Sequence, residues 1–155
     1  KKHLSSLLNC YKKAVFFNEY LPFFEEVYSL DWNLLSDLLD KINQFLLRVL
    51  EIKTEIIKSS DMRPKSTKSD LILELCRKAE ASKYISGPFG RDYLDRESFD
   101  KAGIEILFHD YHPKSYPQLF GDFEPYMSVI DMLFNCGAKE SHQILQTPLG
   151  SLKRT

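Results

Sequence analysis

Apolar residues recur at helical spacing through the first third of the chain. They are clearest from Leu34 to Leu50, where they follow the three-and-four spacing of one buried helical face. The earlier runs "HLSSLLNCYKKAVFF" and "LPFFEEVYSL" have the same period. The pattern predicts helices up to residue 50, and it places the apolar face of Leu34–Leu50 in the core.

The period shortens after residue 50. The stretch "KTEIIKSS" is short and β-branched and precedes a polar loop, which predicts a strand over Thr54–Lys58. Thr67 and Asp70 have the spacing of a capping box, so a helix is predicted over Lys68–Ala81. The stretch "KYIS", residues 83–86, is predicted to be a second strand.

Strands and helices continue to alternate toward the end of the chain. Asp95 or Ser98 can cap a short helix that Gly103 closes, and "IEILFHDY" is predicted to be a third strand, with its alternate isoleucine and phenylalanine positions on one face. The last helix, "YMSVIDMLFNC", is expected to stop at Gly137 and to be followed by a further turn or two. Residues 147–155 are predicted to form a flexible tail.

This order predicts an α/β fold with a short parallel sheet of about three strands, flanked by helices. A single domain is expected over residues 1–146, with helices in 1–50 and a strand–helix core in 52–137. Right-handed crossovers would bring the carboxyl ends of the strands to one edge, where open α/β sheets bind ligands. Those ends carry Ser59, Ser60 and Asp61, then Ser86, Gly87 and Pro88, then Asp110, Tyr111 and His112.

Composition narrows the class of partner. Lys and Arg (21) nearly balance Asp and Glu (22), so no net field recruits nucleic acid or an anionic membrane. No apolar run approaches the ~20 residues of a membrane span. Three cysteines at separate apolar positions are typical of buried, reduced thiols and of a cytoplasmic location. The chain opens at Lys1 inside a helical pattern, so we expect residues to be missing before it.

The stretch "SGPFGRDYLD" combines features of an anion site. Gly87 and Gly90 permit a tight turn, the amides after such a turn can face an anion, and Arg91 adds a fork of donors. The alternative is a plain turn with an arginine that faces solvent. Ser86 lacks the Gly-x-Ser-x-Gly setting of a nucleophile, so it is expected to donate a hydrogen bond at most. Tyr93 is expected to pack with its hydroxyl at the rim.

A polar stripe crosses the otherwise apolar last helix. Ser128, Asp131 and Asn135 fall at spacings of three and four. A buried aspartate needs a cation or several donors, and Arg91 is the expected partner of Asp131. Alternatively, Ser128 and Asp131 form a second capping box, and Asn135 helps to end the helix before Gly137.

The segment before the last helix offers further candidates. His109 and His112 have a metal-ligand spacing, but on an extended segment they would point to opposite faces, so no metal site is predicted. One of the two, beside Asp110, could act as a general base. Tyr116 and Gln118 lie in a run rich in aromatics and prolines that could cover a cleft or form a rigid packed loop.

Three segments in this order resemble the WbqC-like family of bacterial proteins, often encoded with genes for surface-polysaccharide biosynthesis. They are "SGPFGRDYLD", "GIEILFHDYHPKSYPQLFGDF" and "MSVIDMLFNCG". The similarity extends from Lys1 to about Leu145. One departure is that family members usually begin with a strand and turn containing Gln-Pro, and nothing before Lys1 supplies it.

The resemblance implies a Rossmann-like α/β fold and a role in building or modifying sugars of O-antigen or similar glycans. Some relatives are described as amino-acid or glycyl transferases, which implies a small anionic substrate, nucleotide-linked in one version. No cofactor is identified, and an oligomer is compatible with the sequence. The alternative is a non-catalytic scaffold protein that uses the leucine-rich helices as its partner surface. The implied catalytic residues are His109, His112 and Asp131, and the implied substrate-binding residues are Ser86, Gly87, Gly90, Arg91, Asp92, Tyr93, Gln118, Ser128 and Asn135.

Overall fold

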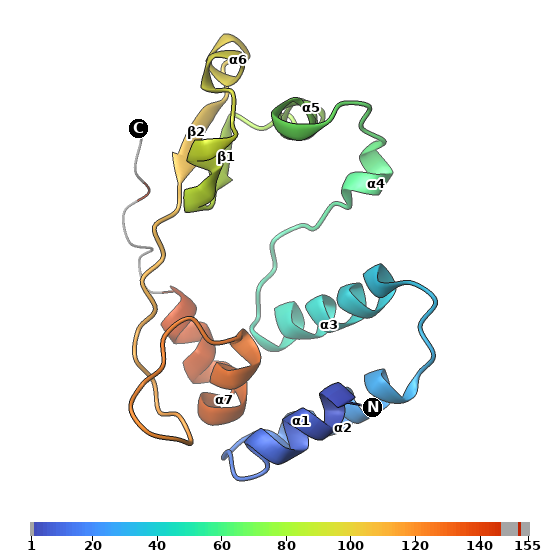
Figure 1. The fold of residues 1–155 in the computed structure, drawn as a ribbon, viewed down its shortest axis with the longest axis vertical. Helices are drawn as coiled ribbons and strands as arrows, with labels where there is room; N and C mark the ends of the chain where they lie inside the picture. Colours follow the sequence, from blue (N-terminus) through green and yellow to red (C-terminus); the bar gives the residue numbers. More distant parts are fainter. Residues whose placement is uncertain (1, 147–151, 153–155) are drawn as a thin grey trace. The chain divides into compact units, whose positions relative to one another are not determined.

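The computed structural model describes residues 2–146 and 152, and it divides the chain into two compact units (Figure 1). The first unit runs through Thr54 and resumes at Pro113, whereas the second comprises Glu55–His112. Each unit is built around its own cluster of buried residues. The predicted tail, apart from Leu152, lies outside the described residues, and the single domain over residues 1–146 stays a prediction.

The first unit is helical, as its sequence period predicts. Its core joins Phe17, Tyr20 and Phe24 of one helix to Leu133 and Phe134 of the last helix. The aromatic rings meet mostly edge to face, a favourable geometry for aromatic pairs. The helices are α1 (Lys2–Tyr11), α2 (Phe17–Ser29), α3 (Leu35–Val49) and α7 (Val129–Gln146).

The helix α3 forms as predicted, but its apolar face is only partly covered. Phe45, in its carboxyl half, stacks on Phe23 with ring centroids 3.6 Å apart. In contrast, Leu34, Leu35 and Leu39 are 59%, 69% and 48% exposed. The prediction that this whole face is core is therefore wrong for the amino half. Helical spacing identifies an apolar face but cannot say whether another element covers it.

The second unit contains a parallel pair of strands that lie side by side (Figure 1). Strand β1 (Lys83–Ser86) pairs with β2 (Glu105–Phe108), and Ser86 lies opposite Phe108. The predicted strand 83–86 is confirmed, and the strand predicted over 104–111 forms only over Glu105–Phe108. Ile104, Ile106 and Phe108 do share one apolar cluster. The other elements are α4 (Ser59–Met62), α5 (Lys68–Lys78), the 3₁₀ helix η1 (Pro88–Asp92) and α6 (Arg96–Lys101).

The predicted strand over Thr54–Lys58 does not form. Residues 52–58 have no regular structure, and the side chains of Ile56 and Ile57 are exposed. β-Branched residues favour an extended chain, but a strand also needs a neighbour for its backbone groups. The sheet of the described residues therefore has two strands instead of about three, and a Rossmann-like layering is not confirmed.

Helix boundaries follow their local signals closely. Thr67 is the N-cap residue of α5, although its side chain makes no capping bond. Asp95 caps α6, because its carboxylate accepts from the backbone N–H of Ser98. Gly103 ends that segment with a positive φ of 71°. Gly137 interrupts α7 with φ 74° and ψ 173°, so the predicted stop is a break followed by further helix.

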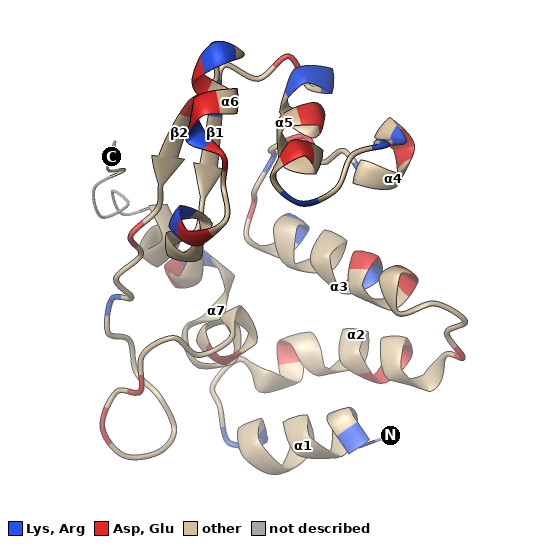
Figure 2. Ribbon diagram, turned by 45° about the horizontal axis from the view of Figure 1, so that its top comes forward, with Lys and Arg blue, Asp and Glu red and all other residues tan. Residues whose placement is uncertain are grey.

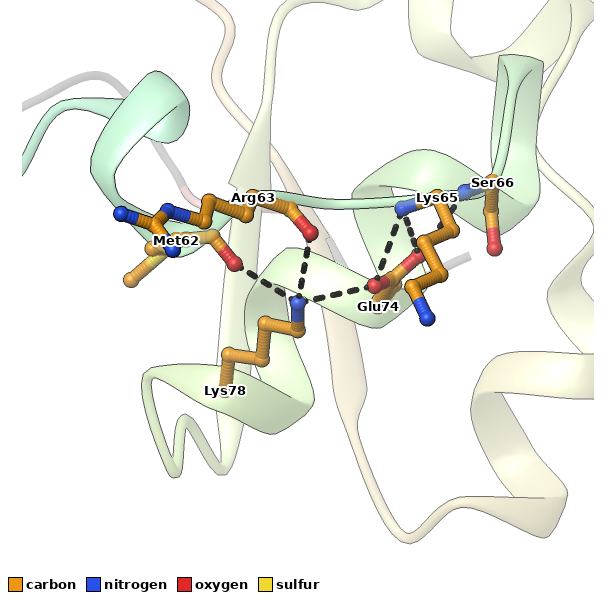
Figure 3. A network of polar contacts seen from close by, with 6 residues as sticks. All are labelled: Met62, Arg63, Lys65, Ser66, Glu74 and Lys78. Atoms are coloured by element: carbon orange, nitrogen blue, oxygen red, sulfur yellow. Dashed lines mark hydrogen bonds and ion pairs between the residues drawn. The ribbon is translucent and has the colours of Figure 1, made fainter.

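A network of polar contacts attaches the loop before α5 to that helix (Figure 3). The Glu74 carboxylate accepts from the backbone N–H groups of Lys65 and Ser66, and it pairs with Lys78 Nζ at 3.0 Å. Lys78 Nζ also donates to the carbonyl oxygens of residues 62 and 63. The bond from Lys78, with those from Ser66 and Lys65, lowers the pKa of Glu74 to about 2. The carboxylate is therefore ionised at neutral pH, and it holds the loop in place.

The distribution of charged residues and the burial of two cysteines agree with the expectations from composition, whereas the third cysteine does not. Basic and acidic residues are interspersed along α3 and α5 (Figure 2). Among the described residues, no helix combines the length and apolar character that a membrane crossing requires. Cys76 and Cys136 are buried, and burial raises the pKa of Cys136 to about 11. Cys10 is exposed, which corrects the expectation that all three thiols are buried.

Candidate functional site

The glycine turn of the second unit begins where β1 ends. The side chain of Ser86 is buried, and its Oγ donates to the carbonyl oxygen of Gly87 at 3.1 Å. Gly90, on η1, packs directly over it. A Cβ at Gly90 would lie 2.0 Å from Ser86 Oγ and 3.0 Å from Leu94 Cδ1. Glycine at this position is therefore required by the close approach of Ser86.

Gly87 has no such structural reason to be glycine. Its φ is −67°, which any residue can adopt, and no atom lies within 4 Å of the position that a Cβ would take. The chain therefore leaves open space next to the backbone at Gly87. Glycine at an open, unstrained position is suited to the close approach of a ligand to the backbone.

These two glycines predict opposite effects of the same substitution. Gly90→Ala is expected to lower the free energy of unfolding by about 1–3 kcal/mol, the usual cost of overpacking. Gly87→Ala should leave it unchanged or raise it by up to about 1 kcal/mol, since alanine restricts the unfolded chain. Urea denaturation followed by circular dichroism measures both. Equal destabilisation by the two variants would contradict the close packing of Gly90 on Ser86.

Arg91 lies at the carboxyl edge of the sheet, where the sequence predicts it. Its guanidinium carbon lies 4.3 Å from the ring centroid of Phe108, the last residue of β2, and Nη1 approaches the carbonyl oxygen of Pro88 at 3.4 Å. Arg96 lies above the same ring at 5.6 Å. Cation–π contact orients the Arg91 side chain while leaving it exposed. Two positive charges therefore flank the end of β2.

Asp92 and Tyr93 follow on the same turn. Both are exposed, and Tyr93 ends η1 through its backbone N–H, which donates to the carbonyl oxygen of Gly90. The expectation that Tyr93 packs is therefore wrong, because its ring faces solvent at the rim of the turn.

The two histidines sit just beyond β2. The backbone N–H of His109 donates to the carbonyl oxygen of Ser86 at 2.8 Å, which continues the pairing of the strands. Its Nε2 is buried and has no hydrogen-bond partner among the residues that the structure describes. His112 is exposed, and its Nε2 lies 3.6 Å from Asp110 Oδ1. No group of metal-ligating residues is present in the part of the chain that the structure describes.

In the first unit, a buried carboxylate gathers neutral donors. Asp131 is 5% exposed, and its Oδ2 accepts from the Tyr116 hydroxyl at 2.8 Å and from Gln118 Nε2 at 3.0 Å. Its Oδ1 accepts from Asn135 Nδ2 at 3.4 Å. Burial and a hydrogen bond to Asp131 raise the pKa of Tyr11, and the same two causes raise that of Tyr116 to about 12. The expectation that Asp131 finds several donors is confirmed.

The capping alternative holds for Ser128 but not for Asp131. Ser128 Oγ accepts from the backbone N–H of Ile130 at 3.3 Å, at the start of α7. The Asp131 carboxylate instead binds the side chains of the preceding segment. Asn135 Nδ2 donates to the carbonyl oxygen of Asp131 at 2.8 Å, so it reinforces this turn of the helix. The pairing of Asp131 with Arg91, which belongs to the other unit, stays a prediction.

A pocket of about 260 Å³ opens beside the carboxylate. Gln118 shapes it, because its Nε2 donates to the carbonyl oxygen of Glu124 at 3.1 Å and its Oε1 accepts from the Glu124 backbone N–H at 2.8 Å. Together with its bond to Asp131, these contacts fix the loop against α7. The lining residues are Cys10, Tyr11, Gln118, Leu119, Phe120, Glu124, Met127 and Asp131.

The structure thus places the predicted residues in two groups. The sheet-edge turn brings Ser86, Gly87, Gly90, Arg91 and His109 close together in the second unit. In the first unit, hydrogen bonds bring Gln118, Asp131 and Asn135 together, and Gln118 and Asp131 also line the pocket. Tyr11 could not be identified from the sequence, because its helical spacing indicates only an apolar face. Its contact with Asp131 links positions 120 residues apart in sequence.

Comparison with known proteins identifies the family of the chain. The model of the WbqC-like protein family matches residues 1–143. An uncharacterized protein of Mycobacterium tuberculosis, Rv1507c, is 33% identical over 141 residues, which cover 90% of this chain and 61% of the relative. The chain therefore spans less than two thirds of the length of that relative. No solved structure matches the chain.

Proposed function

Because the chain belongs to the WbqC-like protein family, we propose that it is a small-molecule transferase that binds an anionic substrate at the glycine turn. The observation that carries this proposal is the placement of Arg91. Its side chain is held over Phe108 yet stays exposed, on the same turn as Gly87, and no described residue comes within 4 Å of the position that a Cβ of Gly87 would take. A guanidinium beside an open backbone position is suited to a phosphate or carboxylate group.

We assign different roles to the residues near the turn. Arg91 binds the anion with its donor fork, and Gly87 lets the group approach the backbone. Gly90 and Ser86 hold the turn in shape. His109 and His112 are the proposed proton carriers, since one has an unpartnered Nε2 and the other lies beside Asp110. Asp131 belongs to the first unit, so it stays a proposed catalytic residue that is separate from the anion site of the turn.

The proposal extends to the setting of the reaction. A transferred acyl, aminoacyl or nucleotide-linked group would be added to a sugar of a surface polysaccharide, in the cytoplasm. The free thiols of Cys76 and Cys136 are compatible with a reducing compartment.

A second candidate function rests on α3. Its exposed leucines, Leu34, Leu35 and Leu39, form an apolar strip of the kind that marks protein contacts. This observation favours a scaffold protein of a glycan-assembly complex. Such a protein would respond to none of the small anions below.

Thermal unfolding against nucleotides, nucleotide-sugars, amino acids and simple phosphates tests the transferase. A ligand at ~100 times its dissociation constant adds about 2.7 kcal/mol, which raises the midpoint by roughly 5–10 °C for a chain of this size. Arg91→Ala should remove most of that rise. Arg96→Ala is the matched control, because it removes a charge near the same ring but farther from it. A full shift in Arg91→Ala would refute the assigned role of Arg91.

A further inference from the structure

The pocket beside Asp131 combines a buried negative charge with largely apolar walls. Asp131 lies at its base, Glu124 is its second acid, and none of its eight lining residues is a lysine or arginine. Leu119, Phe120 and Met127 supply apolar surface from the loop that precedes α7. The pocket therefore has a negative potential and a surface suited to a hydrocarbon skeleton.

The hydrogen-bond donors around the carboxylate are neutral groups. Oδ2 accepts short bonds from Tyr116 and Gln118, and the Tyr11 hydroxyl also bonds to the carboxylate. The bond from Asn135 to Oδ1 is long, at 3.4 Å, and none of these four donors carries a positive charge. Neutral donors stabilise a buried anion only in part, and a cation would compensate it more fully.

We propose that this pocket binds the ammonium group of a small primary amine, with Asp131 as its counter-ion and the apolar walls around its carbon skeleton. An anion would be repelled by Asp131 and Glu124. A neutral alcohol could hydrogen-bond to the carboxylate but would leave its charge uncompensated. The aromatic rings of Tyr11 and Phe120 line the same pocket, and aromatic faces attract ammonium groups.

The volume sets the size of the amine. A cavity of roughly 150 Å³ is enough for benzene, so about 260 Å³ accommodates one ring with an aminomethyl arm. Benzylamine is therefore a suitable probe. Benzyl alcohol has nearly the same shape without charge, and benzoate has the opposite charge.

Calorimetric titration of the full chain with these three probes, at pH 7 and fixed ionic strength, tests the proposal. Benzylamine should bind at least about tenfold more tightly than benzyl alcohol, and benzoate should bind most weakly, since like charges repel and opposite charges attract in a partly buried site. Cys10 reports the location, because it is exposed and lines the pocket while Cys76 and Cys136 are buried. Benzylamine should slow the alkylation of Cys10 by iodoacetamide.

Two variants separate charge from shape. Asp131→Asn removes the charge with little change of volume, and it should reduce the affinity for benzylamine to that for benzyl alcohol. Met127→Trp fills the pocket without touching the carboxylate, so it tests the location if Asp131→Asn does not fold. Asp122→Asn is the control, because it removes an exposed carboxylate that does not line the pocket.

Three results would overturn the proposal: equal affinity for amine and alcohol, no binding of benzylamine to the folded chain, or unchanged binding in Met127→Trp. None of them affects the anion site proposed at the glycine turn, which rests on residues of the other unit.

Discussion

Replacement of Phe134 by alanine is expected to lower the free energy of unfolding by about 3–5 kcal/mol, the usual cost of removing a buried phenylalanine. Phe134 is fully buried at the centre of the first unit. Its ring centroid lies 5.1 Å from that of Phe17, 5.2 Å from that of Tyr11 and 5.6 Å from that of Phe24. The cavity left by alanine would remove contacts from both α2 and α7.

Tryptophan fluorescence in a urea titration measures this loss of stability, because the tryptophan lies in the first unit together with Phe134. Trp32 is the only tryptophan, and its Nε1 donates to the carbonyl oxygen of Val27, next to the same core. Phe120→Ala is the matched control, because Phe120 is 70% exposed and its loss should cost under about 1 kcal/mol. If the two variants lost equal stability, Phe134 could not be the centre of the core.

The predictions that succeeded depend on short-range chemistry. Asp95 accepts from a backbone N–H three residues away, and Gly103 and Gly137 adopt conformations that other residues resist. Each of these features depends on residues that are close in sequence, so the local sequence is enough to predict it. The strand at 83–86 is also close in sequence to its partner, with only the short helices η1 and α6 between them.

The predictions that failed depend on distant partners. The amino half of α3 has a helical apolar face, and residues 54–58 have strand composition, but neither finds an element that covers or pairs with it. Periodicity identifies an apolar face that a helix could bury, and β-branching identifies a segment that could pair as a strand. They do not determine whether the rest of the described chain supplies the partner.

The candidate sites also contain some contacts that local sequence predicts and others that depend on distant residues. The spacing of Asp131 and Asn135 along one helix places them on one face, and the family resemblance made Gln118 a candidate. The contribution of Tyr11 could not be predicted, because it depends on how α1 packs near α7. Likewise, the sequence shows two glycines at the turn, but only the geometry separates Gly90, which packs on Ser86, from Gly87, which faces open space.

Replacement of Gly137 by alanine is expected to cost about 2–5 kcal/mol, because two effects add. Its backbone, at φ 74° and ψ 173°, lies in a region that is almost restricted to glycine, which costs roughly 1–3 kcal/mol for another residue. A Cβ would also lie 2.8 Å from two ring carbons of Phe16. The Phe16 backbone N–H donates to the carbonyl oxygen of Phe134 at 3.0 Å, which holds the main chain that bears this ring beside α7.

Gly121→Ala separates the two effects. Gly121 has a similar φ of 62°, but no atom lies within 4 Å of its missing Cβ, so alanine there bears only the conformational cost of about 1–2 kcal/mol. Urea titrations of both variants, followed by Trp32 fluorescence, should show the larger loss for Gly137→Ala, by about 1–3 kcal/mol of overpacking. Equal losses would mean that Phe16 yields to the new methyl group. The break in α7 would then be maintained by backbone conformation alone, and the contact between Phe16 and Gly137 would not stabilise the junction of the two helices.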